Sequence, residues 1–273
     1  MNQPLISIGM PIYNPGQLLR EAIQSILNQT HQNWELLIVD DDSTDRELEN
    51  IEASGLLNDS RIKIYKNEQN IGLAASLNKC IELAKGEYFA RMDQDDISLP
   101  NRLEAQLAFL TSHPQVDLLA TRVNTINFKG KVVGKLPFAI THEDLCAKPW
   151  RSFYMPHPSW MGKMEWFKQH LYKVPQSYYS EDFELLLRSH STSRFYCLNS
   201  VLLHYRIKNK INYVNTLKAY KTIFKLQICY FFKTKKLWFI VLAGTCFLSR
   251  LLNISLLFIR QSILQIKQKI SRI

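Results

Sequence analysis

The sequence predicts an α/β fold in which a mostly parallel sheet carries helices on both faces. Short apolar runs alternate along the chain with stretches in which apolar residues recur every three or four positions, the order that builds a parallel sheet. Acidic clusters directly follow two of these runs, at residues 40–45 and 93–96. Because ligands of such sheets bind outside the carboxyl ends of the strands, both clusters lie where a site is expected.

The first elements illustrate this alternation. Residues 5–12 form an apolar run, and Asn14 followed by Pro15 is typical of a helix start. Apolar residues within 18–27 then recur at helical spacing. The continuous apolar run 34–39 is typical of a strand that is covered on both faces.

The alternation continues through the middle of the chain. After residue 141 the periodicity weakens, aromatic residues and prolines become more frequent, and a helical pattern begins at Glu181. The other expected elements are a strand at 61–66, a helix at 73–85 closed by Gly86, a strand at 87–92, a helix at 100–112, and a hairpin of 116–128 and 131–136 around Lys129-Gly130.

Composition excludes several classes of protein. A chain of 273 residues suits one sizeable domain with an appendage. Its five cysteines are odd in number and widely spread, without a CxxC pair, which indicates reduced thiols of a cytosolic protein. The first residues lack the pattern of a signal peptide. No GxGxxG motif follows the first strand, which disfavours a nicotinamide-dependent dehydrogenase.

Charge is distributed unevenly along the chain. The formal net charge is +10, yet 16 of the 34 basic residues and none of the 24 acidic residues follow Glu184. The part up to Glu184 therefore carries 18 basic and 24 acidic residues, a net charge of −6. An acidic body with a basic tail argues against a general nucleic-acid binder and predicts that the tail contacts an anionic surface.

The tail combines this charge with interrupted apolar runs. Residues 237–248 and 251–259 are apolar, and Ser249-Arg250 separates them. Spanning a bilayer takes roughly 20 predominantly apolar residues, and a central arginine costs about 2.5–3.5 kcal/mol on insertion scales. The pattern favours helices that lie in an anionic membrane interface, and the alternative is a helical pair packed on the domain. The basic residues that flank or punctuate the runs are Lys233, Lys235, Lys236, Arg250, Arg260, Lys267 and Lys269.

The two acidic clusters differ in what they offer. Ser43 and Asp45 suit a helix cap, but the adjacent carboxylates of Asp40 and Asp41 repel each other and therefore suggest a ligand such as a base, a ribose or a metal. In the second cluster the Asp-x-Asp spacing of residues 93 and 95 lets two carboxylates approach one hard divalent cation, which is also a way to bind a diphosphate. The alternative for this cluster is a solvated turn.

A third acidic pair, Glu181-Asp182, begins a helical pattern. Acidic residues are common at helix starts because they interact well with the helix dipole, so this pair alone does not establish a function.

Taken together, these segments resemble the family 2 glycosyltransferases, in the same order and over about residues 4–206. The resemblance implies a GT-A fold, a nucleotide-sugar donor, a divalent cation (Mn²⁺ or Mg²⁺) and inversion at the anomeric carbon. The matching segments are residues 6–14 (ISIGMPIYN), 25–30 (SILNQT), 39–45 (VDDDSTD), 70–74 (NIGLA), 86–88 (GEY), 93–96 (DQDD) and Glu181-Asp182.

The resemblance also implies roles for individual donor-side residues. Pro11 and Tyr13 would line the nucleotide pocket, and Asp41 would meet the base. Asp93 and Asp95 would form the motif that holds the metal and the diphosphate, with Asp95 as the principal metal ligand.

On the acceptor side, Asp182 matches the general base of the family and Glu181 is its neighbour. A sugar hydroxyl is a weak nucleophile, so a base must take its proton as it attacks. The segment 155–160, which includes His157 and Trp160, resembles the acceptor side of small bacterial members that build surface polysaccharides. Trp160 could stack on a sugar, and its alternative is burial in the core.

The sequence departs from the family pattern at three places. Leu77 precedes Asn78 where the family often has an arginine, which puts pyrophosphate contacts from that position in doubt. Lys208 replaces a histidine that follows the Tyr205-Arg206 pair, so His204 is the substitute candidate for a third metal ligand. The tail lacks a Gln-x-x-Arg-Trp motif and multiple spanning helices, which favours transfer of one sugar per event over processive synthesis.

These observations predict a GT-A catalytic domain at residues 1–209, with a nucleotide-sugar half (1–112) and an acceptor half (113–209), and a membrane-associated tail at 210–273. The expected function is inverting transfer from a UDP-sugar to a saccharide or lipid-linked acceptor in bacterial surface-polysaccharide synthesis. We expect a cytoplasmic protein that is peripheral on the inner face of the cell membrane and binds no nucleic acid. The alternatives are a non-catalytic nucleotide- or membrane-binding module derived from a transferase, and a glycoside hydrolase, which also uses paired carboxylates.

Overall fold

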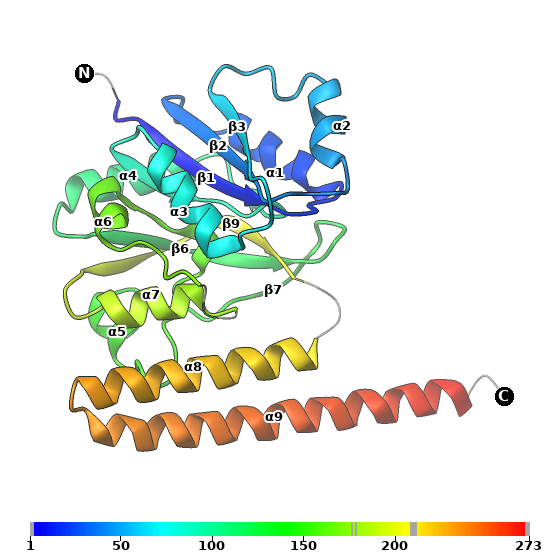
Figure 1. The fold of residues 1–273 in the computed structure, drawn as a ribbon, viewed down its shortest axis with the longest axis vertical. Helices are drawn as coiled ribbons and strands as arrows, with labels where there is room; N and C mark the ends of the chain where they lie inside the picture. Colours follow the sequence, from blue (N-terminus) through cyan, green and yellow to red (C-terminus); the bar gives the residue numbers. More distant parts are fainter. Residues whose placement is uncertain (1–2, 176, 178, 208–211, 271–273) are drawn as a thin grey trace.

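The computed structural model describes the backbone of residues 3–175, 177, 179–207 and 212–270, and the side chains of these residues up to 257. It confirms the predicted α/β class, with one mixed sheet and helices on both of its faces (Figure 1). The strands are β1 (Ile6–Ile12), β2 (Trp34–Asp40), β3 (Ile62–Lys66), β4 (Tyr88–Arg91), β5 (Ile97–Ser98), β6 (Leu118–Ile126), β7 (Val132–Lys135), β8 (Met161–Lys163) and β9 (Phe195–Arg206). The helices are α1 (Leu18–Leu27), α2 (Glu47–Ala53), α3 (Leu73–Leu83), α4 (Arg102–Ser112), α5 (His142–Cys146), the 3₁₀ turn η1 (His157–Ser159), α6 (Met164–Gln169), α7 (Glu181–Ser189), α8 (Tyr213–Lys233) and α9 (Leu237–Ile270).

The first half of the chain forms the parallel part of the sheet, with neighbouring strands in the order β3-β2-β1-β4. All residues of β1 and β2 are buried, and side chains along β2 alternate between two apolar clusters. Leu36 and Ile38 pack in the cluster that contains α1, whereas Leu37 and Val39 pack in the cluster that contains α3. The continuous apolar run of β2 therefore reflects a strand covered on both faces.

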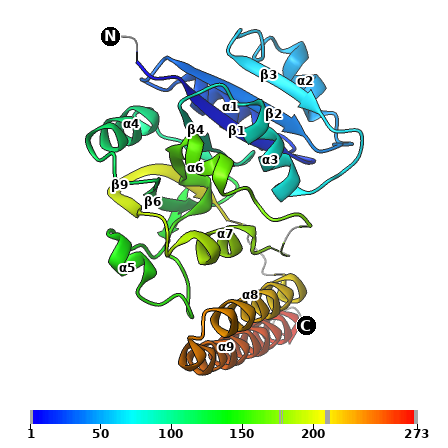
Figure 2. The ribbon, with the colours of Figure 1, turned by 60° about the vertical axis from the view of Figure 1, so that its left-hand side comes forward.

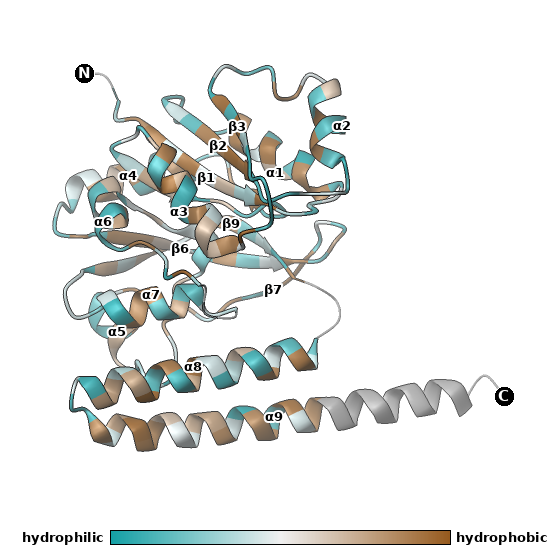
Figure 3. Ribbon diagram, viewed as in Figure 1, coloured by the Kyte–Doolittle hydropathy of each residue, from teal (hydrophilic) through white to brown (hydrophobic). Residues whose placement is uncertain are grey.

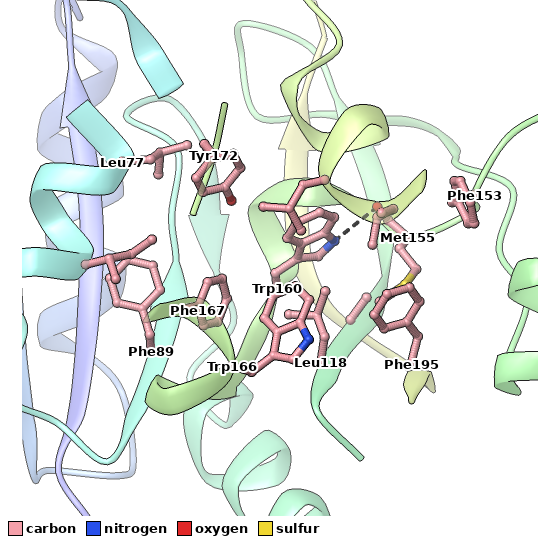
Figure 4. Packing of buried hydrophobic residues seen from close by; sticks show 14 of the residues in the cluster. Leu77, Phe89, Leu118, Phe153, Met155, Trp160, Trp166, Phe167, Tyr172 and Phe195 are labelled. Atoms are coloured by element: carbon pink, nitrogen blue, oxygen red, sulfur yellow. Dashed lines mark hydrogen bonds between the residues drawn. The ribbon is translucent and has the colours of Figure 1, made fainter. Parts of the chain in front are cut away.

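The second half continues the same sheet with mixed strand directions. β8 is antiparallel to both β4 and β6, and β9 is parallel to β6. β6 and β7 form the predicted antiparallel hairpin. The core beneath this half is rich in aromatic side chains, and Trp160 lies at its centre, where its indole nitrogen donates to the carbonyl of Met155 at 3.2 Å (Figure 4).

Strand register brings the predicted site segments to one edge of the sheet. Ile12 is aligned with Asp40, and Gly9 is aligned with Arg91. The chain thus leaves β1, β2 and β4 at neighbouring points of the same edge, and both acidic clusters follow at that edge, as predicted.

The prediction that Gly86 closes a helix at residue 85 is wrong. α3 ends at Leu83, and Ala84 is already extended, with φ −69° and ψ 136°. Gly86 instead lies against the start of β1, where a β-carbon would approach the Leu5 carbonyl oxygen and the Ser7 nitrogen to 2.6 Å. This position requires glycine because two backbone segments come close together.

The tail forms two long helices that run side by side beneath the α/β part of the chain (Figures 1 and 2). Ser249-Arg250 does not interrupt α9, which is continuous from Leu237 to Ile270. Phe231 of α8 is fully buried in the core cluster, so the pair packs on the domain through one side. The predicted boundary at 209/210 falls in residues 208–211, which lie outside the described residues.

The other side of α9 is apolar and exposed (Figure 3). Residues Leu237–Leu257 form one helical segment that is long and apolar enough to cross a membrane by length and composition, and 6% of it is buried against the protein. The exposed large apolar side chains on this helix are Leu237, Trp238, Val241, Leu248, Leu252, Leu256 and Leu257.

Candidate active site

A cavity of about 700 Å³, here called the first cavity, opens at the sheet edge where β1, β2 and β4 end. The structure brings all five predicted donor-side residues to its wall: Pro11, Tyr13, Asp41, Asp93 and Asp95. These residues come from three separate segments of the sequence, and the register of β1, β2 and β4 brings the segments together.

Asp41 is held in this cavity by three hydrogen bonds. Its Oδ1 accepts hydrogen bonds from the Asn67 side-chain amide and the Ile71 amide, both at 2.8 Å, and its Oδ2 accepts from the Gly72 amide at 2.9 Å. The residue is 4% exposed. Three donors fix the orientation of the carboxylate and leave it little freedom to rotate.

Tyr13 is also positioned through its backbone. Gln94 accepts from the Tyr13 amide at 2.7 Å and donates to the Tyr13 carbonyl at 3.2 Å. The side chain of Tyr13 is 49% exposed, so its ring is available to a ligand. Gln94, between the two aspartates of the Asp-x-Asp turn, therefore couples that turn to the end of β1.

Arg91 places a buried positive charge under the acidic residues of the site. The residue is 2% exposed, and its Nη2 donates to Asp93 Oδ1 at 2.6 Å. Burial lowers the pKa of Arg91, but Asp93, Tyr172 and Glu181 together raise it by more than burial lowers it, so the guanidinium stays charged. Its Nε and Nη1 have no hydrogen-bond partner among the described residues. A buried guanidinium with open donors stabilises nearby negative charge.

Asp93 and Asp95 are the carboxylates of the first cavity that could hold a cation. No cluster of three or more His, Cys, Asp or Glu side chains with metal-site geometry occurs in the described part of the chain. Mg²⁺ and Mn²⁺ are commonly held by one or two carboxylates together with substrate phosphates. The donor set therefore fits a cation whose coordination is completed by a diphosphate, and not a cation held by protein groups alone.

A smaller second cavity, of about 270 Å³, adjoins the first and contains Asp182. Tyr205 lines both cavities, which makes them neighbours. Glu181 and Asp182 form the first turn of α7. Burial raises the pKa of Asp182, and the Phe183 amide and Arg91 oppose this rise. Burial and the adjacent Asp182 raise the pKa of Glu181 to about 7. Carboxyls with raised pKa values beside a cavity are candidates for proton transfer.

His157 lines the second cavity and is buried. Its Nε2 is 2.7 Å from the Tyr172 hydroxyl, and burial together with the charge of Arg91 lowers the pKa of His157 well below its usual value. The imidazole is therefore neutral at neutral pH. Of the two interpretations of Trp160, the structure shows core burial: the side chain is fully buried, with its ring centroid 4.5 Å from that of His157 (Figure 4).

The described residues at which the sequence departs from the family pattern lie away from the first cavity. Leu77 is fully buried in the core, and Asn78 exchanges two hydrogen bonds with the backbone of Tyr172, at 2.8 and 2.9 Å. His204 precedes Tyr205 on β9, and consecutive strand residues point to opposite faces, so His204 faces away from the cavities that Tyr205 lines. Lys208 lies outside the described residues.

Sequence reasoning assigned no role to Arg91, Gln94 or Tyr172, and none to Arg206. The Arg206 amide donates to buried Asp96 at 2.7 Å, its Nε donates to the Asp95 carbonyl at 2.7 Å, and its Nη2 reaches Glu21 at 2.7 Å. The sequence pattern that could have indicated Arg91 and Arg206 is a basic residue at the end of an apolar strand. The partners of these charges lie far away in sequence and become visible only in the fold.

Two comparisons with known proteins each match more than half of the chain. The family model described as glycosyl transferase family 2 matches residues 7–171. The chain is 33% identical over 239 residues to an uncharacterized glycosyltransferase of Methanocaldococcus jannaschii, a match that covers 86% of this chain and 82% of the relative.

A second relative has a more specific name. The chain is 37% identical over 148 residues to WfgD of Escherichia coli, named a UDP-Glc:alpha-D-GlcNAc-diphosphoundecaprenol beta-1,3-glucosyltransferase. This match covers 53% of the chain and 56% of WfgD, so the chain matches little more than half of that relative.

The fold is similar to the crystal structure of S. aureus TarS 1-349 in complex with UDP-GlcNAc. The TM-score is 0.63 at 18% identity, over 82% of this chain and 66% of the TarS chain. This likeness supports the predicted GT-A type of α/β fold.

Proposed function

The chain belongs to glycosyl transferase family 2 and is a glycosyltransferase, and we propose that it moves a sugar from a UDP-sugar to a saccharide hydroxyl of a lipid-linked acceptor. The observation that carries this proposal is the contact of the two cavities at Tyr205, which sets the Asp-x-Asp turn of one beside Asp182 of the other. A donor in the first cavity and an acceptor in the second would meet at this junction.

Two similar proteins support the proposed nucleotide and acceptor. TarS, whose fold is similar, has been crystallised with UDP-GlcNAc, and WfgD is named for a UDP-glucose donor and a diphosphoundecaprenol acceptor. The first cavity offers Asp41 for the imide and ribose donors of such a nucleotide, and Tyr13 for its ring faces. We extend the same donor and acceptor classes to this chain, within bacterial surface-polysaccharide synthesis.

The proposed reaction needs one base and one stabilised leaving group. Asp182 takes the proton of the acceptor hydroxyl while the hydroxyl oxygen forms a bond to the anomeric carbon. The bond from that carbon to the diphosphate oxygen breaks on the opposite face, and the diphosphate leaves with the electron pair. The configuration of the anomeric carbon is therefore inverted.

Asp93 and Asp95 would hold a divalent cation, Mn²⁺ or Mg²⁺, against the diphosphate. When bound, the cation supplies positive charge that stabilises the leaving diphosphate. Arg91 orients Asp93 through their ion pair, and its charge also favours the ionised form of Asp182.

Binding measurements test the donor site without any need for the acceptor. Without a cation, the diphosphate and the two aspartates repel each other, so we expect UDP to bind the full chain at least about tenfold more tightly with Mn²⁺ than without it. Asp95→Asn should remove most of this enhancement. Isothermal titration with UDP, GDP and TDP, each with and without Mn²⁺, makes the comparison. Equal affinity in all conditions would rule out a cation site at Asp93 and Asp95.

A further inference from the structure

A third cavity, of about 800 Å³, lies between the tail helices and the segment 148–154 that leads from α5 toward η1. Its wall includes three cationic side chains, those of Lys148, Arg151 and Arg250. None of its lining residues is acidic, and none of the three cations forms an ion pair with another described residue. Like charges that share a cavity without counter-charge favour an anionic ligand.

The cavity is built by specific contacts between the tail and the domain. Gln227 of α8 donates to the Pro149 carbonyl at 3.1 Å, and the rings of Trp150 and Phe239 lie 4.6 Å apart. These contacts hold the segment 148–154 against the helix pair.

Arg250 is the central residue of this arrangement. Its guanidinium donates to the Arg151 carbonyl and lies 5.4 Å from the centre of the Tyr220 ring. The charge that would be costly in a membrane interior is therefore turned toward the domain, into a polar cavity that also includes Ser152 and Ser249. The position of Arg250 in the middle of an apolar helix thus has a structural reason.

The third cavity shares a lining residue with the second cavity, which contains the candidate base. Tyr154 lines both the third cavity and the second, which contains Asp182. Tyr205 in turn joins the second cavity to the first. Three neighbouring cavities therefore lead from the nucleotide end of the sheet, past the candidate base, to the tail.

The exposed face of α9 adjoins the third cavity. Thr245 and Ser249 line the cavity, and Leu248 and Leu252, each three residues farther along α9, are more than half exposed. Because residues three apart are neighbours on a helix surface, the cavity wall and the exposed apolar residues adjoin on α9. A ligand with an anionic group in the cavity could extend an apolar chain along this helix.

We propose that the third cavity binds the diphosphate of the lipid-linked acceptor, with Lys148, Arg151 and Arg250 as its cationic ligands. The acceptor saccharide then extends through the second cavity to Asp182, and the lipid lies along the exposed stripe of α9. This assignment rests on the proposed function and specifies how its acceptor is recognised. The same cationic chemistry could take a phospholipid head group of the membrane, and the connection through Tyr154 to Asp182 favours the acceptor diphosphate.

The test uses the full chain with the substitutions Lys148→Gln and Arg151→Gln combined, because both side chains are exposed and can change without loss of packing. The matched control combines Lys225→Gln and Lys233→Gln, which removes two exposed charges from α8 outside the cavity. Arg250→Gln is measured separately because it also contacts Tyr220.

Binding of a short-chain prenyl diphosphate in neutral detergent is measured first, because it requires no turnover. We expect the cavity variant to bind this probe at least about tenfold more weakly than the control variant, since two charge-assisted contacts are lost. UDP affinity should stay unchanged in both variants. Equal probe affinity in the cavity and control variants would overturn the assignment.

Two further measurements distinguish an acceptor-diphosphate site from a membrane head-group site, and failure of this assignment from failure of the proposed function. If the cavity variant loses binding to phosphatidylglycerol vesicles as strongly as to the prenyl diphosphate, the cavity is a membrane head-group site and the acceptor assignment is wrong. In turnover assays the cavity variant should have a raised KM for a lipid-diphosphate saccharide and an unchanged KM for the same saccharide on a neutral alkyl chain. Retained probe binding without any turnover by the unaltered chain would contradict the proposed function while supporting an anion site.

Discussion

At the scale of single residues, the site depends on charges that control one another. Asp182 must be ionised to accept a proton, and its raised pKa means that the ionised fraction falls as the pH decreases. Arg91 favours ionisation, while the adjacent carboxyl of Glu181 opposes it, because like charges on one helical turn repel. The pH dependence of turnover is therefore a direct probe of this cluster.

We predict that turnover declines on the acid side of the profile, because burial raises the pKa of the base Asp182 above its ordinary value. Glu181→Gln removes a negative charge beside Asp182, so the acid limb of the profile should move to lower pH. Arg91→Met removes a positive charge, so the limb should move to higher pH. Rate profiles of kcat/KM between pH 5 and 9 for the three proteins measure both shifts. Shifts in the same direction for both variants would show that these charges do not act on the base.

At the scale of secondary structure, much of the fold could be predicted from local patterns. The strands β1, β2 and β4 and the helices α1 and α4 follow from apolar periodicity, and the parallel order places both acidic clusters at one sheet edge. The short strands β5 and β8 and the helices α5 and α6 were missed, because each has at most six residues and no resolvable period. The continuity of α9 across Arg250 was also missed, since the compensating contacts of that side chain come from the domain.

The close backbone approach at Gly86, just before β4, predicts a loss of stability when a side chain is added there. A β-carbon at this position would meet backbone atoms of β1 at 2.6 Å, and strands cannot separate without loss of the sheet contacts. Gly86→Ala should therefore lower the free energy of unfolding by about 1–3 kcal/mol, as expected of overpacking. Urea titration with constant slope measures this change.

Gly244→Ala is the matched control for this substitution. Gly244 lies inside α9, and a β-carbon there meets nothing within 4 Å. The control should be neutral or stabilising by up to about 1 kcal/mol, because alanine favours helix formation. Destabilisation by the control but not by Gly86→Ala would contradict the account of both positions.

At the scale of the whole molecule, the two sides of the tail differ in what they contact. One side of the α8–α9 pair packs on the domain, the other exposes large apolar side chains, and the turn between the helices carries exposed Lys233, Lys235 and Lys236. We predict that the protein floats with anionic vesicles and that high salt weakens but does not abolish this attachment, since apolar insertion is not screened.

Flotation with phosphatidylglycerol and phosphatidylcholine vesicles measures this attachment. A chain that ends at Thr234, and the full chain with Leu248→Gln and Leu252→Gln, should both lose flotation while UDP still binds, because the first cavity contains no tail residue. Recovery of the full chain in the soluble fraction with both lipids would show that the tail serves only to pack on the domain.

The central claim is that Asp182 activates an acceptor hydroxyl for transfer from a nucleotide sugar bound in the first cavity. The most direct measurement follows the product by mass spectrometry, with a panel of UDP-sugars, Mn²⁺ and a lipid-diphosphate saccharide as acceptor, for the unaltered chain and Asp182→Asn. We predict that one UDP-sugar yields product carrying one added sugar, and that Asp182→Asn lowers turnover by roughly 100-fold or more while UDP affinity is unchanged. Equal turnover by the variant, or binding of UDP without transfer of any sugar by the unaltered chain, would contradict the claim.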